Sequence, residues 1–199
     1  MPLTYSKLLT IALMSVMLLA CAGKSARPVS SISVQSKAIE RPVFTPEVLA
    51  EYKASVEELK AGNIETAKRR FSKLVKVYPL MAGAEVNLGI IADLQQDKTV
   101  ANAHFDRALK ANPSNLDALI YSASYQQEAG LFAAAEQHLL KAEQIAPNSD
   151  IVQYNLGVLY ELYLQEYERA VEHYQRYVEL SQSDDTEKVK RWIKLLERK

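Results

Sequence analysis

The sequence has little of what catalysis, disulfide bonding or nucleic-acid binding requires. Its 199 residues include a single cysteine, Cys21, and only six glycines, and 24 basic residues balance 24 acidic ones. One cysteine cannot form an internal disulfide or a multi-cysteine metal site. Six glycines leave no glycine-rich phosphate loop, and mixed charges do not indicate a nucleic-acid partner. We therefore expect no enzyme, no cofactor, no small-molecule substrate and no nucleic-acid ligand.

The longest apolar run covers residues 8–20 and follows one basic residue, Lys7. About 13 residues are too few to cross a bilayer, because a spanning helix needs roughly 20. The run is typical of a secretory signal peptide, which we predict at residues 1–20. It ends in Leu18-Leu19-Ala20-Cys21, which resembles the bacterial lipobox. The alternatives are an ordinary signal peptide with an accidental cysteine and an amino-terminal membrane anchor.

The lipobox resemblance implies that Cys21 is acylated and becomes the new amino terminus. Two or more acyl chains anchor a protein stably, whereas one alone is marginal. Ala22 occupies the place where an Asp commonly retains lipoproteins at the inner membrane of enteric-type bacteria. We therefore expect an anchor in the outer membrane, with the protein facing the periplasm. Residues 21–44, rich in serine and without helical period, are predicted to form a flexible tether.

Three prolines, Pro79, Pro113 and Pro147, stand 34 residues apart and indicate a repeat of helix pairs. Small and large apolar residues recur in phase with them. The residues twelve and eight places before each proline are Ala67 and Phe71, Ala101 and Phe105, and Ala135 and Leu139.

The fourth unit repeats the pattern with Leu156-Gly157, Tyr160 and Ala170. Together these residues resemble the tetratricopeptide repeat family, whose marks are Leu-Gly, Tyr, Ala, Phe, Ala and Pro at fixed offsets. The resemblance implies an all-α, right-handed solenoid of about four helix-turn-helix repeats over residues 45–182. We expect the repeats at 45–81, 82–115, 116–149 and 150–182. Ala170 lies 35 residues after Ala135, so we place one extra residue in the turn from Leu164 to Tyr167.

The last segment, residues 183–199, is predicted to be a capping helix. Ser183-Asp184-Asp185 is a helix-start signal, with acids at the positive end of the helix dipole. Val189, Trp192, Ile193 and Leu196 then form an apolar stripe that can cover the last repeat. We interpret Trp192 as a packing residue beneath this cap.

The family resemblance also implies a binding site, because the first helix of each repeat lines the concave surface. Tyrosine, amide and aliphatic side chains there suit a peptide, since rings give contact area at small entropy cost. Tyr121 and Tyr154, on successive first helices, are predicted to be the central anchor. The full set of predicted groove residues is Tyr52, Asn87, Ile90, Tyr121, Ser124, Gln127, Tyr154, Asn155 and Val158.

Three histidines, His104, His138 and His173, recur at spacings of 34 and 35 and at first suggest a metal triad. Packed helices lie about 8–10 Å apart, whereas zinc holds its nitrogens at about 2.0–2.1 Å. Equivalent positions on successive helices are therefore too far apart to share one ion. We expect partly covered flank residues and no metal site.

These features predict an outer-membrane lipoprotein that acts as a protein-protein interaction scaffold or assembly factor for an envelope complex. Its partner would be a protein or peptide segment of that complex. Tetratricopeptide lipoproteins of this kind include pilotins of type IV pilus assembly, and others regulate peptidoglycan synthesis enzymes. Both roles are alternatives that the residues do not separate, because the fold serves many unrelated partners.

Overall fold

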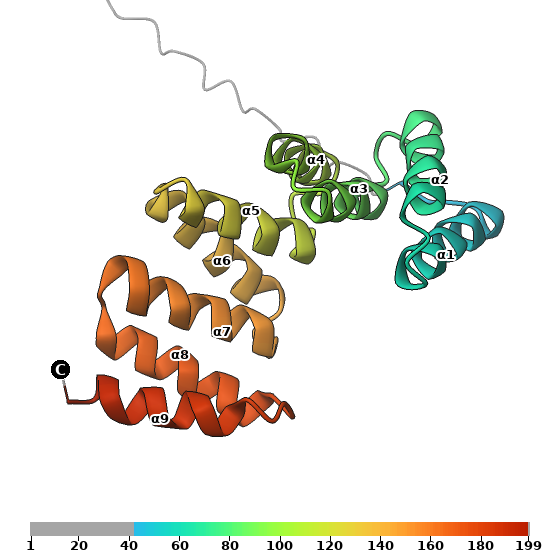
Figure 1. Ribbon diagram of the computed structural model, residues 1–199. Coiled ribbons are helices and arrows are strands. Elements are labelled where there is room, and N and C mark those ends of the chain that lie inside the picture. Colours follow the sequence, from blue (N-terminus) through green and yellow to red (C-terminus); the bar gives the residue numbers. More distant parts are fainter. Residues whose placement is uncertain (1–41, 199) are drawn as a thin grey trace, which may run out of the picture. The chain divides into compact units, whose positions relative to one another are not determined.

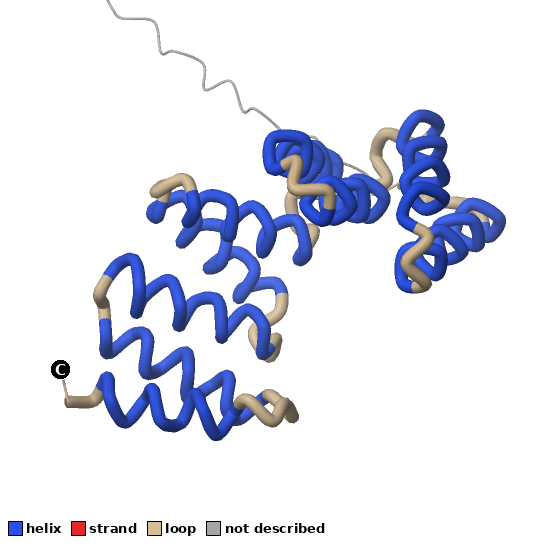
Figure 2. Tube along the Cα trace, in the orientation of Figure 1, coloured by secondary structure: helices blue, strands red, loops and turns tan. Residues whose placement is uncertain are grey.

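The computed structural model describes residues 42–198. Cys21, the predicted signal peptide and most of the predicted tether lie outside these residues. Helices and short connections make up the described part, which contains no strand (Figures 1 and 2). The all-α prediction is confirmed. Among residues 42–198, no helix combines the length and the apolar character that crossing a bilayer requires.

The helices follow one another as antiparallel neighbours, and each packs against the next in the chain (Figure 1). The first two pairs are α1 (Pro46–Lys60) with α2 (Ile64–Val77) and α3 (Ala82–Leu94) with α4 (Lys98–Ala111). The third pair is α5 (Leu116–Glu128) with α6 (Phe132–Ile145). In the fourth, α7 (Asp150–Val158) continues as η1 (Leu159–Leu164) and precedes α8 (Tyr167–Leu180), and α9 (Thr186–Leu196) ends the array.

One residue with positive φ stands in the turn inside each pair. These residues are Gly62 at 80°, Gln96 at 62°, Gly130 at 75° and Gln165 at 57°. Their spacings of 34, 34 and 35 residues repeat the period of the prolines. Such a left-handed residue stops a helix after its last turn and redirects the chain, so it sets where each second helix begins.

Helix starts are capped by short polar side chains at several places. Thr45 Oγ1 accepts a hydrogen bond from the Val48 amide at 3.5 Å, and Asn115 Oδ1 accepts one from the Ala118 amide at 2.9 Å. Asn63 precedes α2 without a side-chain capping hydrogen bond, and its side-chain amide donates to Glu58 Oε2 at 2.8 Å. The turn at Gly62 therefore begins α2 without a side-chain cap.

The core lies between the first and second helices, and both contribute buried residues to it. The residues predicted from the proline phase are fully buried there: Ala67, Phe71, Ala101, Phe105, Ala135, Leu139 and Ala170. An added Cβ on Gly89 would lie 2.5 Å from Phe105 Cε1, and one on Gly157 would lie 2.5 Å from the Tyr174 ring. Glycine is needed at both places because an aromatic ring of the paired helix fills the space of a side chain.

The extra residue of the fourth unit lies in η1, not in the turn after it as the sequence predicted. Residues Leu159–Leu164 form a π-helix, in which each hydrogen bond spans one residue more than in an α-helix. The Glu166 amide closes the segment by donating to the Tyr160 carbonyl at 2.9 Å. The wider turn takes up one residue while Leu159 and Tyr160 stay fully buried.

The final helix, α9, packs against α8. Val189, Ile193 and Leu196 are buried in the core cluster that also contains Tyr174. Trp192 is only partly buried, with its ring centroid 6.0 Å from that of Tyr174. Three members of the predicted stripe thus lie in the core, and Trp192 lies at its edge.

Candidate functional site

The predicted groove residues lie on the first helices of the four pairs, and we call their shared surface the first-helix face. The repeat period aligns most of them into rows. One row holds Asn87, Tyr121 and Asn155, a second holds Ile90, Ser124 and Val158, and a third contains Tyr52 and Tyr154. Most of these side chains are partly exposed, and Ser124 is exposed.

Gln127 does not fit the predicted groove, because it is buried with 9% of its surface exposed. It lies on the last turn of α5, where the chain turns toward α6. A helix exposes only part of its circumference, and the sequence alone did not place Gln127 on the covered part.

At the first pair, Tyr52 is built into the contact between α1 and α3. The Asn87 side-chain amide donates to the Tyr52 hydroxyl at 3.1 Å and to the Gly83 carbonyl at 2.7 Å. The Tyr52 ring meets the Phe71 ring edge-on, with centroids 5.9 Å apart. Burial raises the pKa of Tyr52 above its ordinary value.

In the middle of the face, Tyr121 stacks on the Phe105 ring of the preceding pair at a centroid distance of 4.7 Å and an interplanar angle of 2°. The neighbouring Tyr125 hydroxyl donates to Asp93 Oδ1. Burial and this hydrogen bond raise the pKa of Tyr125. Tyr121 is thus a half-exposed ring backed by the core, with Asp93 and Asp117 close enough to raise its own pKa in addition to burial.

Tyr154 has a different setting. Its ring lies 6.1 Å from Tyr174 and 5.2 Å from Tyr177, both on the second helix of its own pair. Tyr121 and Tyr154 therefore occupy different rows, one residue apart in register, on their successive first helices. About 100° of helix rotation separates the two rows.

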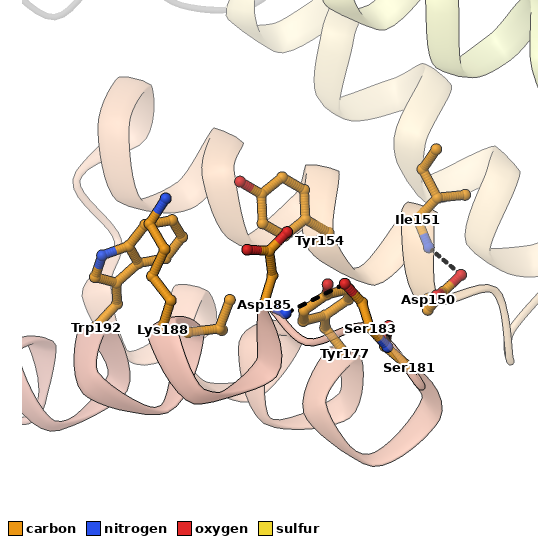
Figure 3. A pocket seen from close by; sticks show the side chains of 10 residues that line it. Asp150, Ile151, Tyr154, Tyr177, Ser181, Ser183, Asp185, Lys188 and Trp192 are labelled. Atoms are coloured by element: carbon orange, nitrogen blue, oxygen red, sulfur yellow. Dashed lines mark hydrogen bonds between the residues drawn. The ribbon is translucent and has the colours of Figure 1, made fainter.

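A cavity of about 370 Å³ lies between α7 and α9, and we call it the α7–α9 cavity (Figure 3). Tyr154 borders it from α7, Tyr177 from α8 and Trp192 from α9. The other lining residues are Asp150, Ile151, Ser181, Ser183, Asp185, Lys188 and Val189. Of all these residues, only Tyr154 was in the predicted groove.

The residues of this cavity that the sequence did not predict could have been found from the repeat period. α9 begins at Thr186, 36 residues after the start of α7 at Asp150, so α9 takes the place of a fifth first helix. From the sequence, this helix was predicted only to cover the core. A second cavity of about 310 Å³, the α1–α3 cavity, lies at the other end of the first-helix face and includes Tyr52, Leu49 and Met81.

The three histidines stand on the second helices and bond within their own pairs. His104 Nδ1 lies 2.7 Å from Glu85 Oε2, which also accepts from Arg107 Nε at 3.1 Å. Burial alone would raise the pKa of Glu85, but the hydrogen bonds from His104 and Arg107 outweigh it and lower that pKa. His138 Nδ1 lies 2.9 Å from Gln126 Oε1.

His173 is held by a buried amide. Gln153 Nε2 donates to Glu143 Oε1 at 3.0 Å, which leaves its oxygen facing His173 Nδ1 at 2.8 Å. Because an amide oxygen only accepts, the Nδ1 atom carries the proton. Within residues 42–198, no three metal-binding side chains come together. Each of the three histidines is partly buried and contacts the first helix of its own pair.

Comparisons with known proteins match the repeat pattern. A tetratricopeptide repeat model matches residues 52–115 and 95–150, and another matches residues 152–181. Curated protein sequences give no significant match.

Solved structures with the same fold include Pseudomonas aeruginosa pilF, with a TM-score of 0.62 and 23% identity over 70% of this chain and 63% of that one. A tetratricopeptide repeat protein from Parabacteroides merdae has a TM-score of 0.61 and 20% identity over 77% and 61% of the two chains. MamA AMB-1 has a TM-score of 0.59 and 17% identity over 76% and 81%. The chain thus spans less than two thirds of the first two proteins.

Such identities show the fold alone. The family models, however, together cover more than half of the sequence, and the helix pairs, turn residues and buried small–large positions recur at the same period. The chain belongs to the tetratricopeptide repeat family.

Proposed function

We propose that the protein is a non-catalytic scaffold whose first-helix face docks a segment of another protein during assembly of an envelope complex. In this proposal a lipidated Cys21 holds it at the outer membrane, facing the periplasm. The observation that carries the binding role is the face itself, where half-exposed tyrosines backed by the core alternate with polar side chains. Tetratricopeptide repeats bind other proteins.

The amides of the face are suited to a peptide backbone. Asn87 and Asn155 each donate to a carbonyl of their own helix, Gly83 and Ile151, at 2.7 Å. Neither Oδ1 atom has a hydrogen-bond partner among the described residues. Each can therefore accept a hydrogen bond from a backbone N–H of a docked segment without breaking an existing contact.

The test is site-specific photo-crosslinking in intact cells. The crosslinking residue replaces Ser124, which is exposed on α5 in the first-helix face, and in a matched control it replaces Gln137, which is exposed on α6. We expect a discrete crosslinked protein from position 124 and none from position 137. Crosslinks from position 137 alone would place the binding surface on the second helices and contradict the proposal.

A role in pilus assembly is the second candidate, favoured by the structural likeness to Pseudomonas aeruginosa pilF. The crosslinked partner separates the alternatives. A secretin subunit at position 124 would support a pilotin-like function, whereas a peptidoglycan synthase would support regulation of cell-wall synthesis.

A further inference from the structure

We propose that the segment docked on the first-helix face inserts a basic side chain, arginine or lysine, into the α7–α9 cavity. This inference rests on the proposed function and adds the chemistry of the partner. It follows from the aromatic rings, the charges and the size of the cavity.

The charges of the cavity are unbalanced. Asp150 and Asp185 line it against a single cation, Lys188. The Asp150 carboxylate accepts a hydrogen bond from the Ile151 amide at 2.8 Å. It forms no ion pair with a cation among residues 42–198. The Asp185 carboxylate has no hydrogen-bond or ion-pair partner among residues 42–198. Figure 3 shows it between α9 and the Tyr154 ring.

Lys188 forms no ion pair with either acid in the described part of the chain. Its Nζ atom lies 4.9 Å from the centroid of the Trp192 ring. A cation over an aromatic face is attracted by the negative potential of the ring face. This contact within the cavity shows that its aromatic wall already holds one positive charge, while Asp185 remains available for a second.

The remaining rings offer the same chemistry to a partner. Tyr154 and Tyr177 lie 5.2 Å apart at the cavity, and the Asp185 charge is near enough to Tyr154 to raise the pKa of its hydroxyl in addition to burial. A planar guanidinium can stack on such rings and form two hydrogen bonds with a carboxylate. A volume of about 370 Å³ corresponds to roughly twelve water molecules, enough for a long side chain.

The α1–α3 cavity provides the contrast. Its described lining contains no charged residue: Pro42, Phe44, Leu49, Tyr52, Leu80, Met81, Ala82, Gly83, Asn112 and Asn115. The two cavities on the first-helix face therefore differ in the kind of side chain that they can bind. A docked segment would place its apolar part at the α1–α3 end and its basic residue at the α7–α9 end.

Trp192 is the only tryptophan of the chain, so its fluorescence reports on the α7–α9 cavity. The experiment titrates the full-length protein with the capped tripeptide Ala-Arg-Ala. Ala-citrulline-Ala, which has the same shape without charge, and Ala-Leu-Ala serve as matched probes. We expect the arginine probe to bind at least tenfold more tightly than either neutral probe.

The variant Asp185→Asn should abolish this preference. Asp184→Asn is the control, because it removes the same charge from an exposed neighbour outside the cavity and should keep the preference. Equal responses to all three tripeptides, or equal effects of the two variants, would overturn the proposal. Self-association of the wild type that Asp185→Asn abolishes would also overturn it, because a second copy would then occupy the cavity.

The two proposals can fail separately. A crosslink at position 124 without an arginine preference would contradict only the proposed basic side chain in the cavity. Docking on the first-helix face would still be supported. An arginine preference without any crosslink at position 124 would leave the cavity assignment intact and contradict docking across the first-helix face.

Discussion

Gly89 and Gly157 each lie beneath an aromatic ring, Phe105 and Tyr174, of the second helix in the same pair. The equivalent place in the third pair is Ala123, and the residue at the ring position there is Leu139. In the last three pairs the small and large residues therefore change together, whereas the first pair combines Ser55 with the Phe71 ring. At the scale of single residues, the smaller Leu139 explains why the third pair accepts the methyl group of Ala123, whereas the rings of the second and fourth pairs require glycine.

We predict that Gly89→Ala lowers the free energy of unfolding by about 1–3 kcal/mol, because the new methyl group overpacks against Phe105. Chemical denaturation measures the loss. The double variant Gly89→Ala with Phe105→Leu imitates the third pair and should lose less than the sum of the two single changes. If the two single losses of stability simply add in the double variant, the Phe105 ring is not the reason for glycine at position 89.

We predict that the stability of the folded protein depends on pH through His173. Burial lowers its pKa in the folded protein, and Arg169 and Arg176 add to this, although Glu143 opposes it. Below the unfolded pKa of about 6.5, the unfolded chain therefore binds a proton that the folded chain does not. Stability should fall as the pH drops from about 7.5 toward 5.5.

The variant His173→Asn should reduce this fall, as measured by urea midpoints at both pH values. His138, whose pKa burial also lowers, contributes in the same direction, so part of the fall should remain. An unchanged difference between the two midpoints in His173→Asn would contradict the assignment.

At the scale of elements, the second helices were predictable because each carries a small and a large residue in one phase, and the first three are also followed by a proline. Pro79, Pro113 and Pro147 each follow a second helix, as expected. The site was less predictable, because the α7–α9 cavity joins residues from elements far apart in sequence. Asp150 and Asp185 acquire a shared role only when α9 packs as a fifth first helix.

Deleting residues 184–199 tests the role of α9. The deletion exposes the surface that Val189, Ile193 and Leu196 cover, and each such side chain contributes about 1.5–3 kcal/mol by burial. We expect the melting temperature to fall by roughly 10 °C and the protein to self-associate. A monomeric truncated protein with unchanged melting would mean that α9 is a dispensable tail.

The whole molecule combines the repeat array with the proposed lipid anchor. Cys21→Ser removes the acylation site, and within residues 42–198 no helix can replace the anchor. We predict that this variant is found unprocessed or in the soluble periplasmic fraction. Fractionation and labelling with a radioactive fatty acid measure both outcomes. A processed variant that stays firmly bound to membranes would contradict the lipoprotein proposal.

The π-helix η1 changes how positions are to be compared across the array. Before Leu159, equivalent positions in successive pairs are 34 residues apart. In α8, the second helix of the fourth pair, they are 35 residues from those in the third pair, as Ala135 and Ala170 show. An alignment that applies a constant period thus pairs each residue of α8 with the wrong counterpart. Loss of one residue within η1, such as the exposed Leu162, would turn the π-helix into ordinary α-helix and leave the neighbouring units where they are. Relatives one residue shorter at this point can therefore share the same binding face.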